Sequence, residues 1–243
     1  MIDQPVPGAS APAEPVTPRP AASLVLLRTP KAGPERAEVL MGRRPETARF
    51  MPGVFVFPGG ALDPGDSAHG AALIGRDAAP PHLLRTAQAD EAVGLIWSAL
   101  RETWEETGLL IGAAAAAAAA SATPPDCPAG AAYAEAGLAP GREALHYIAR
   151  AVTPPISPIR FDTRFFMADA ERAHGEAAAS GELPEVLWVP VGEALASSKV
   201  RGVSKFVLRR ALELAAEPAL LRAPERPVPR YTYEGDARVV TDE

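Results

Sequence analysis

The chain has 243 residues, 47% of them hydrophobic, and a formal net charge of −6. This length allows one buried domain with additional segments. The acidic balance argues against a general nucleic-acid binder, which usually carries a basic face. Cys127 is the only cysteine, so no disulfide can form within the chain. Without a recognisable signal peptide, a peroxisomal address or an apolar run of about 20 residues, we expect a cytoplasmic protein with no membrane partner.

The first half of the chain predicts strands, a loop and one long helix. Proline and alanine dominate residues 1–21, which predicts a disordered N-terminus. Short apolar runs predict strands at residues 22–28, 38–44 and 54–57. Residues 64–88 show no periodicity and predict a long loop. Helical periodicity then runs from 90 to 107, and Gly108 supplies the C-terminal end of this helix.

The second half predicts a linker followed by further strands and helices. Residues 113–120 are all alanine and predict either a helical extension or a slack connector, within a linker of about 112–141. Strands are predicted at residues 147–152, 161–168 and 186–191, and helices at 192–198 and 204–216. Residues 217–243 predict a proline-rich tail in which 230–233 can add an edge strand. This mixture predicts an α/β fold, with one sheet covered by helices.

Three glutamates near the end of the long helix form the most informative local pattern. Glu102, Glu105 and Glu106 have the spacing i, i+3 and i+4, which places them on one face of a helix. Clustered carboxylates repel one another, and Mg²⁺ or Mn²⁺ prefers such oxygen ligands together with substrate phosphates. The alternative is an ordinary solvated acidic face. Together with Arg101 and the upstream Pro58-Gly59-Gly60, the pattern favours a metal site for a phosphorylated substrate.

These residues resemble the signature of the Nudix hydrolase family, which reads Gly, five residues, Glu, seven residues, then Arg-Glu-apolar-x-Glu-Glu-x-Gly-apolar. Gly60 matches the opening glycine. The second half is matched by Arg101, Glu102, Thr103 at the apolar slot, Glu105, Glu106, Gly108 and Leu109. An insertion at about residues 67–89 interrupts the signature. The resemblance covers residues 22–216 and implies a Nudix-type α/β/α sandwich with a mixed β-sheet.

The interruption narrows the resemblance to one branch. Residues 50–63 and 160–166 are similar to the Nudix proteins related to coenzyme A and acyl-CoA diphosphatases. The intermediate glutamate of the family, which mostly supports the arginine, is absent from its usual place before Arg101. Asp66 and Glu91 are the two candidates for this supporting role.

The resemblance implies roles for the residues that match the signature. Arg101, Glu102, Glu105 and Glu106 are the expected catalytic set, with Arg101 holding the carboxylates in position. Glu105 and Glu106 are the first choices as metal ligands. Glu102 is either a third ligand or the base that orients water. A main-chain carbonyl at Gly59 would complete the metal shell, because glycine lets the backbone approach closely.

Further residues are candidates for binding substrate. Arg43, Arg44 and Arg49 precede the lead-in strand and either grip the diphosphate or form a solvated charge cluster. Gly60 joins this substrate-binding set. An extra carboxylate from a loop across the site is expected at Glu182, with Glu185 behind it. By contrast, Asp162 and Arg164 alternate with phenylalanines on a predicted strand and indicate a structural ion pair.

The implied reaction is Mg²⁺- or Mn²⁺-dependent hydrolysis of a diphosphate linkage in a nucleoside-diphosphate-X substrate, most favourably CoA or acyl-CoA. One alternative is a pyrophosphatase for ADP-ribose, a dinucleotide or a nucleotide sugar. The other is a non-catalytic ligand-binding Nudix module. The expected partner is a small-molecule diphosphate and not a nucleic acid or a membrane, and a homodimer is left open.

Overall fold

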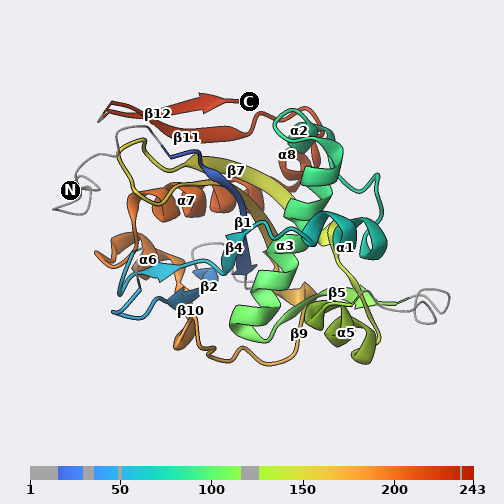
Figure 1. Ribbon diagram of the computed structural model, residues 1–243. Coiled ribbons are helices and arrows are strands. Elements are labelled where there is room, and N and C mark those ends of the chain that lie inside the picture. Colours follow the sequence, from blue (N-terminus) through green and yellow to red (C-terminus); the bar gives the residue numbers. More distant parts are fainter. Residues whose placement is uncertain (1–15, 30–35, 49–50, 116–125, 236) are drawn as a thin grey trace.

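A mixed β-sheet of nine strands forms the centre of the described molecule (Figure 1). The computed structural model describes residues 16–29, 36–48, 51–115, 126–235 and 237–243. Along the sheet lie β10 (Glu185–Pro190), β2 (Glu38–Arg43), β1 (Arg19–Arg28), β8 (Phe161–Asp169), β7 (His146–Val152), β11 (Pro229–Glu234) and β12 (Ala237–Asp242), with β3 (Phe55–Val56) paired to β2 and β4 (Gly59–Ala61) paired to β1. β1 runs parallel to β8 and β7 parallel to β11, whereas the other pairs are antiparallel.

Helices cover both faces of this sheet, which confirms the predicted α/β/α sandwich. One layer contains α1 (Asp66–Leu73), α2 (Pro81–Leu84), α3 (Ala89–Thr107) and α5 (Pro128–Glu135), and the other contains α6 (Val191–Ala196), α7 (Gly202–Ala216) and α8 (Pro218–Arg222). A smaller three-stranded sheet consists of β6 (Leu138–Pro140), β5 (Leu110–Ala114) and β9 (Ala173–His174). In the described part of the chain, no helix has the length and apolar character needed to cross a membrane.

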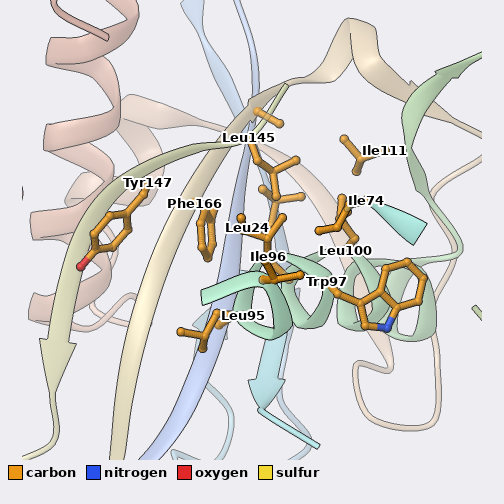
Figure 2. Packing of buried hydrophobic residues seen from close by; sticks show 14 of the residues in the cluster. Leu24, Ile74, Leu95, Ile96, Trp97, Leu100, Ile111, Leu145, Tyr147 and Phe166 are labelled. Carbon is orange, nitrogen blue, oxygen red and sulfur yellow. The ribbon is translucent and has the colours of Figure 1, made fainter. Parts of the chain in front are cut away.

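β1 is buried on both faces and therefore joins the two cores. Leu24 and Leu26 pack toward α3, and the alternate residues Val25 and Leu27 pack toward α7, as expected for a strand in the middle of a two-sided sandwich. Figure 2 shows Leu24 among apolar side chains of α3, including Leu100. This packing holds α3 firmly across the sheet.

The predicted long helix is confirmed almost to the residue. α3 spans Ala89–Thr107, and Gly108 ends it with a left-handed φ of 75° while its N–H bonds to Trp104. All residues from Ala92 to Arg101 are buried, which is more than one apolar stripe would explain. The additional burial arises because α1 and α5 pack against sides of α3 that the sequence pattern did not mark.

The prediction of a long loop over residues 64–88 is wrong, because α1 and α2 lie within it. α1 is short and rich in small residues, and α2 has only four residues, so their own sequences carry little helical periodicity. α1 is stabilised by its packing on α3, since most helical stability in proteins comes from tertiary contacts.

Two further segment predictions need correction. In the predicted linker of about 112–141, the described residues form the end of β5, then α5 and β6; residues 116–125 lie outside the described structure. Tyr133 of α5 is almost fully buried and donates a hydrogen bond to the Ile111 carbonyl, 3.0 Å away. That burial explains why an alanine-rich segment is ordered there.

The predicted tail of residues 217–243 also contributes structure. β11 pairs in parallel with β7, and β12 forms the outer edge, so 230–233 is an inner strand of the sheet. At the other end, residues 19–21, predicted to be disordered, pair with β8; residues 1–15 lie outside the described structure. The other predicted strands and helices agree with the structure within a few residues, whereas β4, β5, β9, α8 and β12 were not predicted.

Candidate active site

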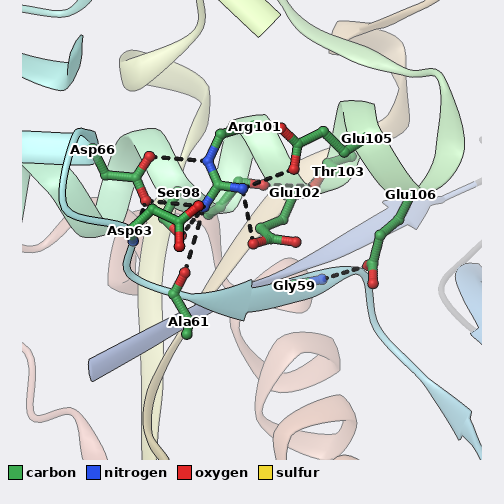
Figure 3. A network of polar contacts seen from close by, with 11 residues as sticks. Gly59, Ala61, Asp63, Asp66, Ser98, Arg101, Glu102, Thr103, Glu105 and Glu106 are labelled. Carbon is green, nitrogen blue, oxygen red and sulfur yellow. Dashed lines mark hydrogen bonds and ion pairs between the residues drawn. The ribbon is translucent and has the colours of Figure 1, made fainter. Parts of the chain in front are cut away.

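The C-terminal half of α3 places four charged residues opposite the short strand β4. Arg101, Glu102 and Glu106 project toward β4, and the Glu105 carboxylate points to Arg101 (Figure 3). The sequence spacing predicted this shared face, and α3 provides it because residues three and four apart are neighbours on a helix.

Arg101 is the centre of the polar network. Its guanidinium is buried, and Nε and Nη2 each donate to one oxygen of Asp66 at 2.9 Å. Nη1 donates to Glu105 Oε2 at 2.7 Å and lies 2.9 Å from Glu102 Oε1. Although burial opposes the charge, Asp66, Glu102 and Glu105 raise the pKa of Arg101 above its ordinary value. A permanently charged arginine therefore orients two of the three glutamates.

Of the two candidate supporting carboxylates, Asp66 contacts Arg101. Asp66 is 1% exposed, and one of its oxygens also accepts a hydrogen bond from the Asp63 N–H at 2.8 Å. Glu91 lies in the first turn of α3, roughly 15 Å along the helix axis from Arg101. The support for the signature arginine thus comes from the residue six positions after Gly60, directly before the insertion.

Three contacts to Arg101 escaped the sequence prediction. Asp63 Oδ2 lies 3.7 Å from Nη2, and the Ala61 carbonyl and Ser98 hydroxyl each accept from Nη2 at 3.4 Å. Ser98 is three residues before Arg101, so helical spacing alone would have identified it. Asp63 and Ala61 reach the arginine only through the fold.

Glu106 is buried against Gly59, the first residue of β4. Its side chain accepts a hydrogen bond from the Gly59 N–H at 2.8 Å, and the residue is 3% exposed. Burial raises the pKa of Glu106 to about 8, and repulsion from Glu102 and Glu182 adds to the rise, while the Gly59 bond opposes it. The charged carboxylate lacks enough compensating positive charge at this position.

Glu102 shares this electrostatic environment. Burial raises its pKa to about 7 against the opposing charge of Arg101, and Glu105 and Glu182 push it in the same direction as burial. Two buried carboxylates on adjacent turns are therefore both poorly neutralised by the protein.

A Cβ atom on either Gly59 or Gly60 of β4 would lie too close to a neighbouring group. Gly59 has a φ of 154°, and a Cβ there would lie 2.4 Å from the Ala22 carbonyl oxygen. A Cβ on Gly60 would lie 2.2 Å from Glu102 Oε1. The Gly59-Gly60 pair thus lets the backbone of β4 lie against the carboxylates of α3.

The remaining predicted carboxylates differ in their positions. Glu105 is the most exposed signature glutamate, with 38% of its side chain accessible, and it bonds to Arg101. Glu182 lies in the exposed loop before β10, close enough to raise the pKa of both Glu102 and Glu106. Glu185 instead pairs with Arg43, with 3.8 Å between Glu185 Oε2 and Arg43 Nη1.

The structure describes two of the three predicted substrate-binding arginines, Arg43 and Arg44. Arg43 Nη2 lies 2.5 Å from Glu46 Oε1, and its Nε donates to the Gly53 carbonyl. Arg44 lies near Glu106, whose pKa it lowers. Arg49 lies outside the described residues. Of the two described arginines, Arg44 therefore lies on the carboxylate side of the site.

The donor chemistry fits a divalent cation. Glu102 and Glu106 are buried oxygen donors whose charged forms are opposed by burial and mutual repulsion, and a cation would relieve both effects. Within the described ranges, no three or more His, Cys, Asp or Glu side chains already lie in a metal-binding arrangement. Glu105 contributes to this result because its carboxylate points to Arg101 (Figure 3).

Comparison with known proteins agrees with the fold and the signature. No family model matches the sequence. The structure is similar to the crystal structure of a NUDIX hydrolase from Alicyclobacillus acidocaldarius, with 30% sequence identity over 85% of this chain and 96% of that protein, and a TM-score of 0.62. The identity and coverage of this match show that the chain belongs to the Nudix hydrolase family. It is a Nudix-type pyrophosphohydrolase, and enzymes of this family generally use divalent metal ions.

Two other similar structures match less closely. A MutT NUDIX hydrolase from Burkholderia pseudomallei has 11% identity over 80% of this chain and 98% of that protein, with a TM-score of 0.45. The NUDIX domain of Shewanella oneidensis NrtR, in a cocrystal with ADP ribose, has 13% identity over 82% of this chain and 90% of that chain, with a TM-score of 0.46.

Proposed function

We propose that this enzyme hydrolyses the diphosphate linkage of CoA or an acyl-CoA with the help of Mg²⁺ or Mn²⁺. The observation that carries the proposal is the pair of carboxylates Glu102 and Glu106, which lie against Gly59 and Gly60 of β4 and whose charged forms are opposed by burial. A site with surplus buried negative charge suits a cation that accompanies an anionic diphosphate. The CoA assignment is supported by the sequence of residues 50–63 and its interrupted signature.

We assign each residue of the site a role in this reaction. Glu105 and Glu106 would hold the cation, with the Gly59 carbonyl as a further ligand. Glu102 either joins them or accepts a proton from the attacking water. Arg101 positions the carboxylates and is itself held by Asp66. When bound, the cation neutralises the diphosphate and polarises the water that attacks phosphorus.

Substrate contacts are assigned to the rim of the site. Arg44, whose charge lowers the pKa of Glu106, would pair with a phosphate oxygen. Gly60 would allow the diphosphate to approach the backbone of β4. Glu182 would supply an extra carboxylate from the opposite loop, where its charge already acts on Glu102 and Glu106.

The decisive experiment is product analysis with three proteins. Wild type, Glu106→Gln and the control Glu91→Gln are incubated with CoA, acetyl-CoA, ADP-ribose, NADH and a nucleotide sugar in Mg²⁺, then in Mn²⁺. We expect wild type and Glu91→Gln to release 3′,5′-ADP and a phosphopantetheine product from a CoA substrate. Glu106→Gln should be at least about 100-fold slower, with an unchanged melting profile as the control for folding.

The other outcomes identify the alternatives. Release of a nucleoside monophosphate from ADP-ribose, NADH or the nucleotide sugar, without CoA cleavage, would overturn the CoA assignment and retain the carboxylate site. Equal inertness of wild type and Glu106→Gln on every substrate, with either metal, would favour a ligand-binding module without catalysis.

A further inference from the structure

A polar cavity lies at the N-terminal end of α3, opposite to the end that carries the candidate active site. It has a volume of about 550 Å³, and its lining includes Arg85, Glu91, Arg150 and Glu243. At 1.5 Å per residue, Glu91 and Glu106 are separated by roughly 22 Å along the helix. A small ligand in this cavity would therefore not contact the signature glutamates.

Arg85 and Arg150 line this cavity, and both contact Glu243, which also lies near Arg230. Arg150 donates through Nε and Nη2 to the two oxygens of Asp162, both at 2.7 Å, and through Nη1 to Glu243 Oε1 at 2.8 Å. Asp162 also pairs with Arg164 at 2.9 Å, which confirms the predicted structural ion pair. Arg150 is thus held in place by Asp162, with one N–H group directed at the Glu243 carboxylate.

Two more arginines reach Glu243. Arg85 Nη1 donates to its main-chain oxygen at 3.4 Å, and Arg85 Nη2 lies 2.6 Å from the exposed Glu225. Arg230 Nε lies 3.6 Å from Glu243 Oε1, which exceeds hydrogen-bonding distance. Including Glu91 in the lining, the acidic residues here balance the arginines, so an incoming anion would have to replace one carboxylate.

Glu243 satisfies this group of arginines incompletely. Its Oε2 is buried without a hydrogen-bond partner among the described residues, and so is Arg230 Nε. Buried polar groups are normally paired; the unpaired Arg230 Nε is a donor that an anionic acceptor would satisfy, and the unpaired Glu243 Oε2 is an acceptor that an incoming phosphate would displace. A phosphate group carries more acceptor oxygens than a carboxylate and matches converging guanidinium groups.

We propose that this cavity is a binding site for a phosphate group, and that the Glu243 side chain occupies it in this structure. Arg150 supplies the largely buried positive charge, and Arg85 and Arg230 supply two partly exposed arms. Binding of phosphate would displace the Glu243 carboxylate, with Asp162 remaining on Arg150. The proposal is independent of the reaction proposed for Glu102 and Glu106.

The test is calorimetric titration of inorganic phosphate into the full chain at constant ionic strength. We expect Glu243→Gln to tighten phosphate binding by about 10-fold, because the competing carboxylate is removed. Adding Arg85→Gln to this variant should abolish the gain. Arg76→Gln is the matched control, since Arg76 is an exposed arginine that pairs only loosely with Asp90, at 3.8 Å, and it should change nothing.

A second variant keeps the test decisive if Glu243→Gln does not fold. Glu225→Gln frees Arg85 without touching Glu243, and we expect it to tighten phosphate binding by about threefold. If neither substitution strengthens binding, or if Arg85→Gln and Arg76→Gln weaken it equally, the bound phosphate is an adventitious ion only and the proposal is overturned.

The source of the phosphate is distinguished by titrating 3′,5′-ADP and AMP beside inorganic phosphate. Tighter binding of a nucleotide that is weakened by Arg85→Gln identifies a phosphomonoester ligand. Equal binding of all three identifies free phosphate. Hydrolysis of the CoA panel by the same variants is measured separately, so failure of the phosphate site and failure of the proposed reaction give different results.

Discussion

At the scale of single residues, the pair of Asp66 and Arg101 explains how an interrupted signature retains its geometry. Asp66 is nearly inaccessible and binds the guanidinium through both oxygens, so the arginine cannot turn away from Glu102 and Glu105. A buried ion pair of this kind is costly to break, because the remaining partner stays charged and desolvated.

Replacing Asp66 with Asn therefore has two expected effects. The free energy of unfolding should fall by about 3 kcal/mol, the lower range for breaking a buried pair, as measured by urea denaturation. Turnover should fall at least about 10-fold, with a smaller change in KM, because the carboxylates lose their orientation. The control is Asp63→Asn, at a side chain that is 60% exposed and 3.7 Å from Arg101. If both variants behave alike, Asp66 does not have this positioning role.

Gly60 offers a test of the contact between β4 and Glu102. A Cβ at this position would lie 2.2 Å from Glu102 Oε1, so Gly60→Ala must move the end of that side chain. We expect turnover to drop by about 10-fold or more, with a change in unfolding free energy below about 1 kcal/mol, because a flexible side chain can shift. Gly181→Ala, which meets nothing within 4 Å, should leave both quantities unchanged. Full activity in Gly60→Ala would contradict the assigned contact.

At the scale of elements, glycine contacts connect α1, which lies at the start of the insertion, to α3. A Cβ on Gly70 would lie 2.7 Å from the Val93 carbonyl oxygen, and a Cβ on Gly94 would lie 2.7 Å from Ser67 Oγ. These two glycines let α1 approach α3 closely, which brings Asp66 to Arg101. The insertion therefore forms part of the site's support.

Gly70→Ala separates helix propensity from helix packing. In an open helix this substitution would stabilise by up to about 1 kcal/mol, but here the added methyl group meets backbone. We expect a net destabilisation of about 1–3 kcal/mol and slower turnover, measured by thermal unfolding and product release. Gly192→Ala in α6, where nothing lies within 4 Å, should be neutral or stabilising. A stabilised and fully active Gly70→Ala protein would refute the close contact.

At the scale of the whole molecule, the C-terminal strands complete the central sheet. Tyr231 on β11 is 3% exposed, and its ring lies 5.2 Å from that of Phe206 on α7. β11 thus contributes to the core on the α7 face as well as to the sheet. This contribution explains why residues 229–242 pair with the sheet despite their proline-rich surroundings.

Truncating Tyr231 tests this contribution. We expect Tyr231→Ala to lower the free energy of unfolding by about 3 kcal/mol, as for other large side chains removed from a core, in a single cooperative transition. Val240→Ala on the edge strand, where the side chain is 47% exposed, should cost less than about 0.5 kcal/mol. If both variants lower the free energy of unfolding by the same small amount, the C-terminal strands do not contribute to the core.

The sequence by itself determined the features that depend on local spacing. Periodicity and residue type predict where the main strands lie along the chain, and they predict the extent of α3 and its end at Gly108. They also predict the shared face of Glu102, Glu105 and Glu106. These features need no knowledge of distant contacts, because each is set within one element.

Only the tertiary structure decided the features that depend on contacts between distant segments. Short alanine-rich helices such as α1 and α5 carry weak local patterns and are ordered by what they pack against. The contact of Asp66, rather than Glu91, with Arg101 and the contact of Arg150 with Glu243 likewise join residues far apart in the chain. Such contacts follow from the burial of whole elements against one another, which no local spacing records.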